Sequence, residues 1–204
     1  MKKEFEEIKK SKYFKYIIAF GIIKKVILLI LLFIPLVSFG QDFRKMNFGD
    51  TKDQLKETYP DVEFLIDSAE GMDLLYHEGN IAGITTQIGY IFFDNKLMSG
   101  SYIFAEKDYL RTDEERVRDY NNVSERLNEK YDMEDNTQWF NTDYKDEPGY
   151  ALSRNHVIFR EVYEGENVYI AHSLAKESGS VGHSVFYASK EFLTMMQRQA
   201  EEDF

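Results

Sequence analysis

Apolar residues recur at helical spacing after two capping signals, and the first of these lies near residue 50. Thr51 is followed three residues later by Gln54, the spacing at which each side chain satisfies a backbone donor of the other residue at a helix start. The signal predicts a short helix over Lys52–Thr58, which Pro60 stops. A strand is expected next, over Val62–Ile66.

The second capping signal, Thr112 with Glu115, precedes a longer periodic segment. We expect a helix over Asp113–Tyr131 with one apolar stripe on an otherwise charged surface. The stripe comprises Val117, Tyr120, Val123 or Ser124, Leu127 and Tyr131. Such a helix is predicted to lie across a sheet.

The segments between and after these helices favour strands. Ile84–Phe93 and Leu97–Phe104 are β-rich runs that flank the turn signal Asp94-Asn95-Lys96, which predicts a hairpin. Both alternating sets of residues are apolar near Ile91–Phe93, so this hairpin is expected to be central, with one face under a helix. The remaining predicted elements are strands over Trp139–Tyr144, Ala151–Tyr163, Val168–Leu174 and His183–Ser189, the middle two joined across Glu164–Asn167, and a terminal helix over Lys190–Glu202.

Hairpins rather than alternating helices and strands place the chain in the α+β class. The pattern predicts two helix-plus-antiparallel-sheet units in tandem, followed by a closing C-terminal helix. The expected organisation is a signal peptide over residues 1–40, a first unit over 41–108 and a second over 109–204. The two units form either separate domains or one continuous domain.

The apolar run over residues 26–39 predicts a leader. It is shorter than the roughly 20 residues that cross a bilayer, and Lys24 and Lys25 would each cost about 2.5–3.5 kcal/mol inside one. A lysine-rich segment before it and small residues just before Gln41 are typical of a secretory signal with cleavage at that point. The alternative is an uncleaved signal-anchor. The chain has no cysteine, which excludes a lipoprotein anchor.

Charge and aromatic content narrow the function classes further. Residues 41–204 keep 17 of the 25 basic and 33 of the 36 acidic side chains, a net charge of −16. This charge repels nucleic acid, because binding to phosphates depends on Lys and Arg. The same segment keeps 24 of the 31 aromatic residues, which is untypical of a disordered acidic chain. We therefore predict a folded, acidic, exported protein, periplasmic or extracellular, with no stable membrane span after cleavage.

Two resemblances follow from short motifs. The segment Phe48–Leu55 resembles the Gly-x-Ser/Thr-x-x-Gln/Glu-Val/Leu helix opening of the small lipoprotein of the outer-membrane β-barrel assembly machinery. The secreted β-lactamase inhibitor protein shares this opening and consists of two helix-plus-sheet units in tandem, so the resemblance implies that architecture. The segments Tyr102–Phe104 and Leu127–Tyr131, followed by Trp139, are similar to exported proteins of unknown function from Bacteroidetes-type bacteria, which implies no activity.

The histidines offer a candidate metal site. His156 and His172 are expected on the two strands of one hairpin, where an odd-length turn would place both on one face. Two imidazoles and a carboxylate can hold zinc, so a hydrolase, using acids or a metal, is one alternative function. The spacing matches no established ligand motif, and the sequence predicts no catalytic residue, no metal site and no cofactor.

An aromatic group is the predicted binding site. Trp139, Phe140, Tyr144 and Tyr150 surround a charged loop, and rings beside a loop can anchor a partner. The alternative is that these rings pack in the core, Trp139 above all. The leading hypothesis is a non-enzymatic binding module of the cell envelope whose partner is a protein or another envelope macromolecule. The remaining alternative is a carrier of a small apolar ligand held between helix and sheet.

Overall fold

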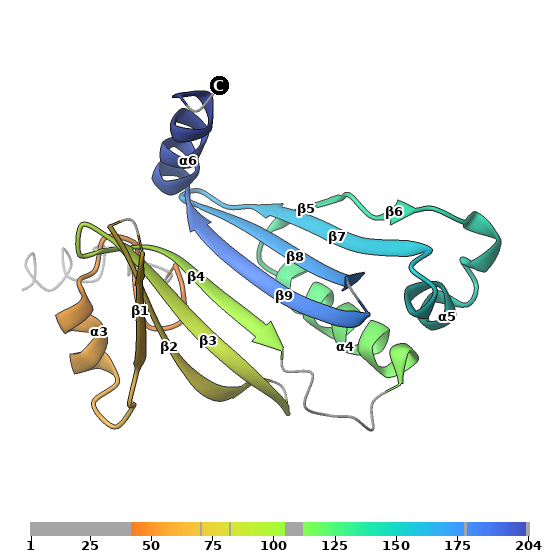
Figure 1. Cartoon of the computed structure of the whole chain (residues 1–204), viewed down its shortest axis with the longest axis horizontal. Coiled ribbons are helices and arrows are strands. Elements are labelled where there is room, and N and C mark those ends of the chain that lie inside the picture. Colours follow the sequence, from red (N-terminus) through yellow and green to blue (C-terminus); the bar gives the residue numbers. More distant parts are fainter. Residues whose placement is uncertain (1–41, 70, 82, 105–111, 178, 203–204) are drawn as a thin grey trace, which may run out of the picture. The chain divides into compact units, whose positions relative to one another are not determined.

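An antiparallel sheet runs through the described chain in the order β1-β2-β3-β4-β9-β8-β7-β5, with β6 paired to β7 (Figure 1). The computed structural model describes residues 42–69, 71–81, 83–104, 112–177 and 179–202. The strands are β1 Leu65–Ala69, β2 Met72–Ile81, β3 Ile84–Phe93, β4 Lys96–Phe104, β5 Asp132–Asp135, β6 Gln138–Trp139, β7 Val157–Glu164, β8 Val168–Glu177 and β9 Ser180–Ser189. The helices are α3 Lys52–Thr58, α4 Asp113–Asn128, α5 Pro148–Ser153 and α6 Lys190–Glu202, with a 3-10 turn η1 at Thr142–Tyr144.

Both predicted capping boxes form. The Thr51 N–H donates to Gln54 Oε1 at 2.8 Å, and the Gln54 N–H donates back to Thr51 Oγ1 at 3.3 Å. Thr112 and Glu115 repeat the arrangement at 2.9 and 3.3 Å. Each pair satisfies two of the backbone donors that a helix start leaves open, which fixes where α3 and α4 begin.

A tight turn sets the register of the central hairpin. Asp94 and Asn95 both have positive φ, 48° and 61°, as a two-residue turn between strongly twisted strands requires. The turn pairs Phe93 with Lys96, and a bulge then shifts the register between Ile91 and Phe92. Short polar side chains tolerate this backbone conformation, so the local sequence specifies the hairpin.

Strands β4 and β9 join two meanders into one sheet. Tyr102 pairs with Val185, and Gly100 pairs with Tyr187. Each of these strands is the last of its meander, so residues far apart in sequence meet at this junction. Residues 41–204 form one compact unit.

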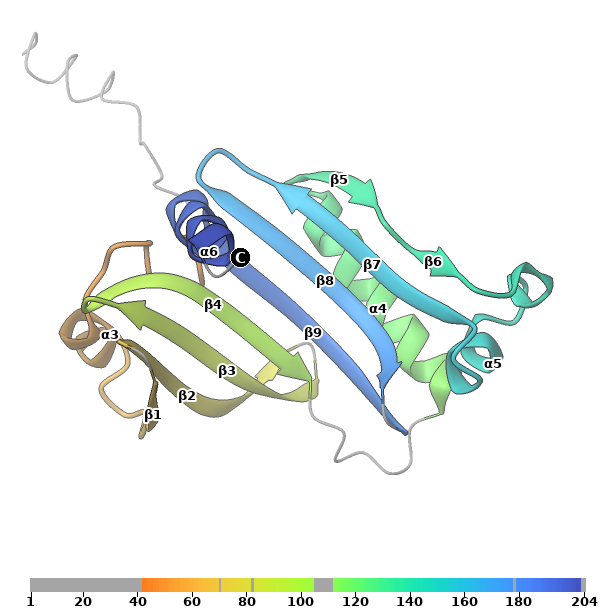
Figure 2. The same cartoon turned by 45° about the horizontal axis from the view of Figure 1, so that its top comes forward.

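Helices cover both faces of the sheet. Leu55 of α3 packs in one core cluster with Leu75 and Tyr90, and Tyr120 of α4 packs in another with Leu174. The strand pairings place Leu75, Tyr90 and Leu174 on the same face. Figure 2 shows α4 running along β7, β8 and β9.

The C-terminal helix α6 packs against the other face. Its Phe192 lies with Ala188, Met98 and Phe93. Tyr187 beside Ala188 and Phe92 beside Phe93 belong instead to the clusters on the face of α3 and α4. Residues next to each other on a strand point to opposite faces. Helix α6 therefore packs on the face of the sheet opposite to α3 and α4.

A glycine allows an N-terminal aromatic ring to reach the sheet. A β-carbon on Gly100 would lie 2.2 Å from the Phe43 ring, so only glycine permits this approach. Phe43 is buried and packs edge-on against Tyr90, with ring centroids 5.3 Å apart. The segment before α3 is thus part of the core.

Several predictions are confirmed. The chain is α+β with an antiparallel sheet, α3 and α6 have the predicted bounds, and the β3–β4 hairpin has the predicted turn. The turn after β7 also lies at Gly165–Asn167, as expected. Among the described residues, no helix is long and apolar enough to cross a membrane. The predicted leader over residues 1–40 and the predicted unit boundary at 108/109 lie outside the described residues.

Other predictions were wrong. The strand expected over Ala151–Tyr163 is helix α5 followed by β7, because Pro148 starts a helix too short to show periodicity. The strand expected over Trp139–Tyr144 is two strand residues followed by η1. The strand expected at Val62–Ile66 begins later, at Leu65, and the long helix ends at Asn128 rather than Tyr131.

Strands were also missed or shortened. β2 was not predicted, because its histidine, glycine and acidic residues interrupt the alternation of apolar and polar positions. β5 was not predicted either, because its four residues are all exposed. β8 and β9 each extend three residues further toward their hairpin turn, which lies at Gly179 with φ of 92°. Backbone pairing between neighbouring strands supports these segments where their own composition does not.

Candidate functional site

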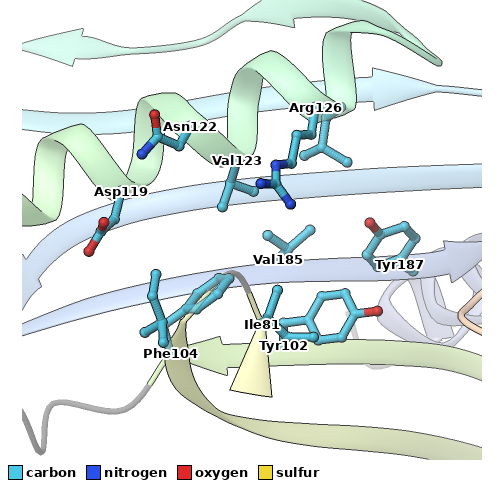
Figure 3. Close-up of a pocket in the computed structure, with 11 residues that line it drawn as sticks. Ile81, Tyr102, Phe104, Asp119, Asn122, Val123, Arg126, Val185 and Tyr187 are labelled. Carbon is cyan, nitrogen blue, oxygen red and sulfur yellow. The ribbon is translucent and has the colours of Figure 1, made fainter. Parts of the chain in front are cut away.

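A pocket of about 150 Å³ lies between α4 and the sheet, over the junction of β4 and β9. Figure 3 shows rings and aliphatic side chains from the strands facing side chains from the helix. The lining residues are Ile81, Ile84, Tyr102, Phe104, Asp119, Asn122, Val123, Arg126, Leu127, Val185 and Tyr187. Its surface is mostly apolar, with polar groups contributed by α4.

The register of β4 against β9 builds the floor. Tyr102 and Phe104 are two residues apart on β4, as are Val185 and Tyr187 on β9, so all four point toward α4. The Tyr102 and Tyr187 rings meet edge to face with centroids 5.8 Å apart. The floor is therefore made of side chains that are brought together only when the two meanders pair.

Helix α4 supplies the polar rim. Asp119, Asn122 and Arg126 recur at three- and four-residue steps, so they follow one side of the helix beside its buried stripe. In Figure 3 the Arg126 guanidinium reaches over the pocket and Asp119 lies toward the opposite end. The apolar floor suits an apolar group of a ligand, and the rim, which carries both charges, suits polar groups next to it.

The tyrosines of the floor stay protonated. Burial raises the pKa of Tyr102 to about 12, and the nearby Arg44 charge opposes that rise. Burial, reinforced by neighbouring tyrosines, also raises the pKa of Tyr187. Both hydroxyls remain neutral hydrogen-bond donors at physiological pH.

The volume limits what the pocket can hold. An engineered protein cavity of about 150 Å³ lined by aliphatic and aromatic side chains binds benzene, whereas pockets for drug-sized ligands span about 300–1,000 Å³. A space of about 150 Å³ therefore accommodates one aromatic ring or a short branched alkyl group. It is too small to enclose a lipid.

A buried polar network lies behind the pocket. Glu161 Oε2 accepts hydrogen bonds from Ser124 Oγ at 2.5 Å, Tyr163 OH at 2.6 Å and His172 Nδ1 at 3.2 Å. Burial alone would raise the pKa of Glu161, but these three donors outweigh it and lower the pKa. A carboxylate with three donors is a stable buried charge.

The two histidines of the network are neutral. Because His172 donates its Nδ1 proton to Glu161, its Nε2 accepts, and His183 Nε2 donates to it at 2.9 Å. Burial lowers the pKa of His172 despite Glu161, and burial together with His172 lowers the pKa of His183 to about 3. The Phe104 ring stacks on His183 at 4.1 Å and separates the network from the pocket.

The network does not have the geometry of a nucleophilic triad. In a triad the serine and the acid bind opposite nitrogens of the histidine. Here Ser124 and Glu161 both lie near Nδ1 of His172, at 3.3 and 3.2 Å, and Nε2 is occupied by His183. The base therefore has no free nitrogen with which to activate Ser124, and the network supports the core.

The predicted aromatic group is only partly exposed. Phe140 and Tyr150 are 62% and 38% exposed, whereas Trp139 is half-buried with its ring edge-on to Phe159 at 5.9 Å. Tyr144 is half-buried and lies 5.0 Å from the Tyr150 ring. The structure places the four residues in and next to β6, η1 and α5, and their role in binding stays a prediction.

The structure does not bring His156 and His172 together. His156 precedes β7 and stacks on Tyr144 at 5.2 Å, while the residue opposite His172 on β7 is Glu161. The expected shared face was therefore wrong. No group of three or more His, Asp or Glu residues suited to a metal ion occurs among the described residues.

Two polar residues at otherwise apolar positions of the sequence indicate the buried network, which was not predicted. Ser124 falls in the apolar stripe of α4, and Glu161 falls between Phe159 and Tyr163 on the buried side of β7. A polar residue at an apolar position indicates a buried hydrogen-bond partner. The pocket had no comparable signal, because its floor and rim come from three distant segments.

Comparison with protein-family models, with curated proteins and with solved structures found no match for this chain.

Proposed function

We propose that the chain is an exported, non-enzymatic binding module that receives one apolar side chain of a protein partner in the pocket beneath α4. The supporting observation is the ring-lined pocket of about 150 Å³ with a rim of both charges. Protein interfaces concentrate binding energy in a few anchor side chains that fill such pockets. The size, the apolar floor and the polar rim all suit an anchor of this kind.

Selection from a peptide library tests this function. Peptides are selected on the wild type, and their affinity is then measured on Val123→Phe, which fills the pocket. An anchor side chain that loses its pocket loses about 1.5–3 kcal/mol, so affinity should fall about tenfold or more. Asn121→Phe adds the same ring on the exposed side of α4 and should change affinity less than about twofold.

The sequences of the selected peptides provide a second readout. We expect one Phe, Leu or Trp at a constant position, with an acidic neighbour that faces Arg126. Failure to enrich any peptide, or equal binding to the wild type and Val123→Phe, would contradict the proposal.

A carrier of a small apolar ligand is the second candidate, and the same apolar lining favours it. A carrier retains its ligand during purification, whereas an anchor pocket does so only with its partner. Native mass spectrometry of the purified protein separates the two readings. A co-purified mass that Val123→Phe removes would favour the carrier.

Export is part of the proposal. The lysine-rich leader over residues 1–40 and the acidic character of the rest of the chain support it. N-terminal sequencing of protein recovered from the cell envelope or the medium should begin at Gln41. A sequence beginning at Met1 would contradict cleavage.

We also propose that the chain consists of two related helix-plus-sheet units. The capped helix α3 is followed by β1–β4, and the capped helix α4 by β5–β9. The last strands of the two units, β4 and β9, pair with each other. The pocket would then lie at the seam between the units.

A further inference from the structure

Arginine occupies a turn position that ordinarily favours glycine, asparagine or aspartate. Phe43 and Met46 exchange backbone hydrogen bonds at 3.1 and 3.0 Å, so Arg44 and Lys45 form a two-residue turn. Arg44 has φ of 57° at the first turn position. A residue with a β-carbon in this conformation costs about 1–2 kcal/mol, which is why such turns favour glycine. Arginine at this position therefore carries a backbone cost that glycine would avoid.

Part of the Arg44 side chain is buried without a counter-charge. Its Nη1 has no hydrogen-bond partner, and no carboxylate in the described part of the chain forms an ion pair with it. The guanidinium lies 5.8 Å from the centroid of the Tyr59 ring. Acids are abundant in this protein, so the missing partner is not a matter of composition. A buried cationic donor without an acceptor is costly.

Two further polar atoms without partners surround the same tyrosine ring. They are the hydroxyl of Tyr90, a residue with no exposed surface, and Nε2 of His77. The Tyr90 and His77 rings lie 6.2 and 6.4 Å from the Tyr59 ring and stack on each other at 6.2 Å. Three polar groups without partners thus share one neighbourhood, and none of them lines the pocket beneath α4.

The state of each group is set by its surroundings. Burial, and next the neighbouring Tyr59 hydroxyl, raises the pKa of Tyr90, so it remains a donor. The Arg44 charge opposes that rise, which places the guanidinium within electrostatic reach of this hydroxyl. His77 Nδ1 donates to the Glu78 carbonyl at 2.9 Å, so its Nε2 is an acceptor.

We propose that Arg44 and Tyr90 bind a small oxyanion, a carboxylate or a phosphate, beside Tyr59. The guanidinium and the phenol donate hydrogen bonds to the oxyanion, and the anion supplies the negative counter-charge that the Arg44 guanidinium lacks. A water molecule could satisfy the hydrogen bonds but would leave the charge uncompensated. Lys45 Nζ, 5.8 Å from the Tyr59 centroid, adds a second cation on the exposed side of the turn.

Titration with acetate and with phosphate, each against chloride at constant ionic strength, tests this site. Amide NMR shifts of the wild type should saturate with acetate, phosphate or both, and the preferred anion identifies the ligand class. Chloride should produce no saturable shift. Equal responses to all three salts would show screening only and would overturn the proposal.

Three variants separate the site from a general charge effect. Arg44→Gly removes the guanidinium while suiting the turn, and it should weaken anion binding about tenfold or more. Tyr90→Phe removes one hydroxyl and should weaken binding severalfold. Lys45→Gln removes one positive charge outside the core and should change binding less than about threefold. Undiminished binding by Arg44→Gly, with Tyr90→Phe also unchanged, would overturn the proposal.

Discussion

Each half of the sheet holds a partly buried charged group on the same face, but the two groups differ in their hydrogen bonds. Beside α4, Glu161 receives three hydrogen bonds from protein donors. Near α3, the buried Nη1 of Arg44 donates no hydrogen bond to the described chain, and the hydroxyl of Tyr90 lies near that of Tyr59 without a well-formed hydrogen bond. Among the described residues of the α4 half, the neutral hydroxyl of Tyr120 is buried near Glu161 without a well-formed hydrogen bond, and its ring stacks on His172 at 4.0 Å.

This difference distinguishes a structural network from a candidate ligand site. A buried charge with a full set of partners stabilises one packing arrangement, and removing it leaves those partners unsatisfied. A buried charge without partners is a local cost that a bound ion would relieve. Stability should therefore depend on the Glu161 network, whereas ligand response should depend on Arg44.

Acidification should produce the largest effect. The pKa values of His172 and His183 are lowered, so the unfolded chain binds more protons below its ordinary histidine pKa of about 6.5. The free energy of unfolding should fall by about 1.4 kcal/mol per pH unit for each histidine as the pH drops from 6.5 toward the folded-state values. Urea denaturation at pH 7, 6, 5 and 4 measures the slope.

A non-titrating variant tests the assignment of that slope. His183→Gln can still donate to His172, and it should make the dependence on pH shallower. An unchanged slope in this variant would show that the pH dependence arises elsewhere.

Removal of the buried carboxylate should come next in size. Glu161→Ala leaves Ser124, Tyr163 and His172 without their acceptor and should lower the free energy of unfolding by about 3 kcal/mol. Glu161→Gln keeps the shape and one acceptor oxygen, so it should cost less. Urea denaturation at pH 7 measures both, and a loss below about 1 kcal/mol in Glu161→Ala would contradict the network's structural role.

The matching change in the other half should be small. Arg44→Gly relieves the left-handed turn but gives up the packing of the arginine side chain, so the free energy of unfolding should change by less than about 1 kcal/mol. The same denaturation series applies. A loss as large as that of Glu161→Ala would remove the contrast between the two halves.

The exposed rings should affect stability least. Phe140→Ala should change the free energy of unfolding by less than about 0.5 kcal/mol, because the ring is 62% exposed. Trp139→Ala is the matched comparison and should cost more, since its ring packs on Phe159. If Phe140→Ala also weakens a selected peptide, the aromatic loop extends the binding surface beyond the pocket.

Elements were predicted correctly from the sequence where the residues that specify them lie close together in the chain. The capping pairs at Thr51 and Thr112 and the turn at Asp94 lie within a few residues of the structures that they specify, and all three were found. α5 is a single short helix without a visible period, and β2 relies on its neighbours for hydrogen bonds. Neither can be read from local composition alone.

The candidate sites depended on distant residues. The floor of the pocket needs β4 beside β9, and the Arg44 neighbourhood needs a turn placed over β2 and β3. No sequence spacing encodes these contacts. The aromatic loop was visible in the sequence because its members are close together, and proximity alone did not show which rings would be exposed.

NMR titration with toluene tests the central claim, the anchor pocket, most directly. Methyl signals of Ile81, Val123 and Val185 should shift saturably in the wild type and in Asn121→Phe, and the remaining pocket signals should not respond in Val123→Phe. Shifts that are absent, that arise away from these residues, or that persist unchanged in Val123→Phe would contradict the claim.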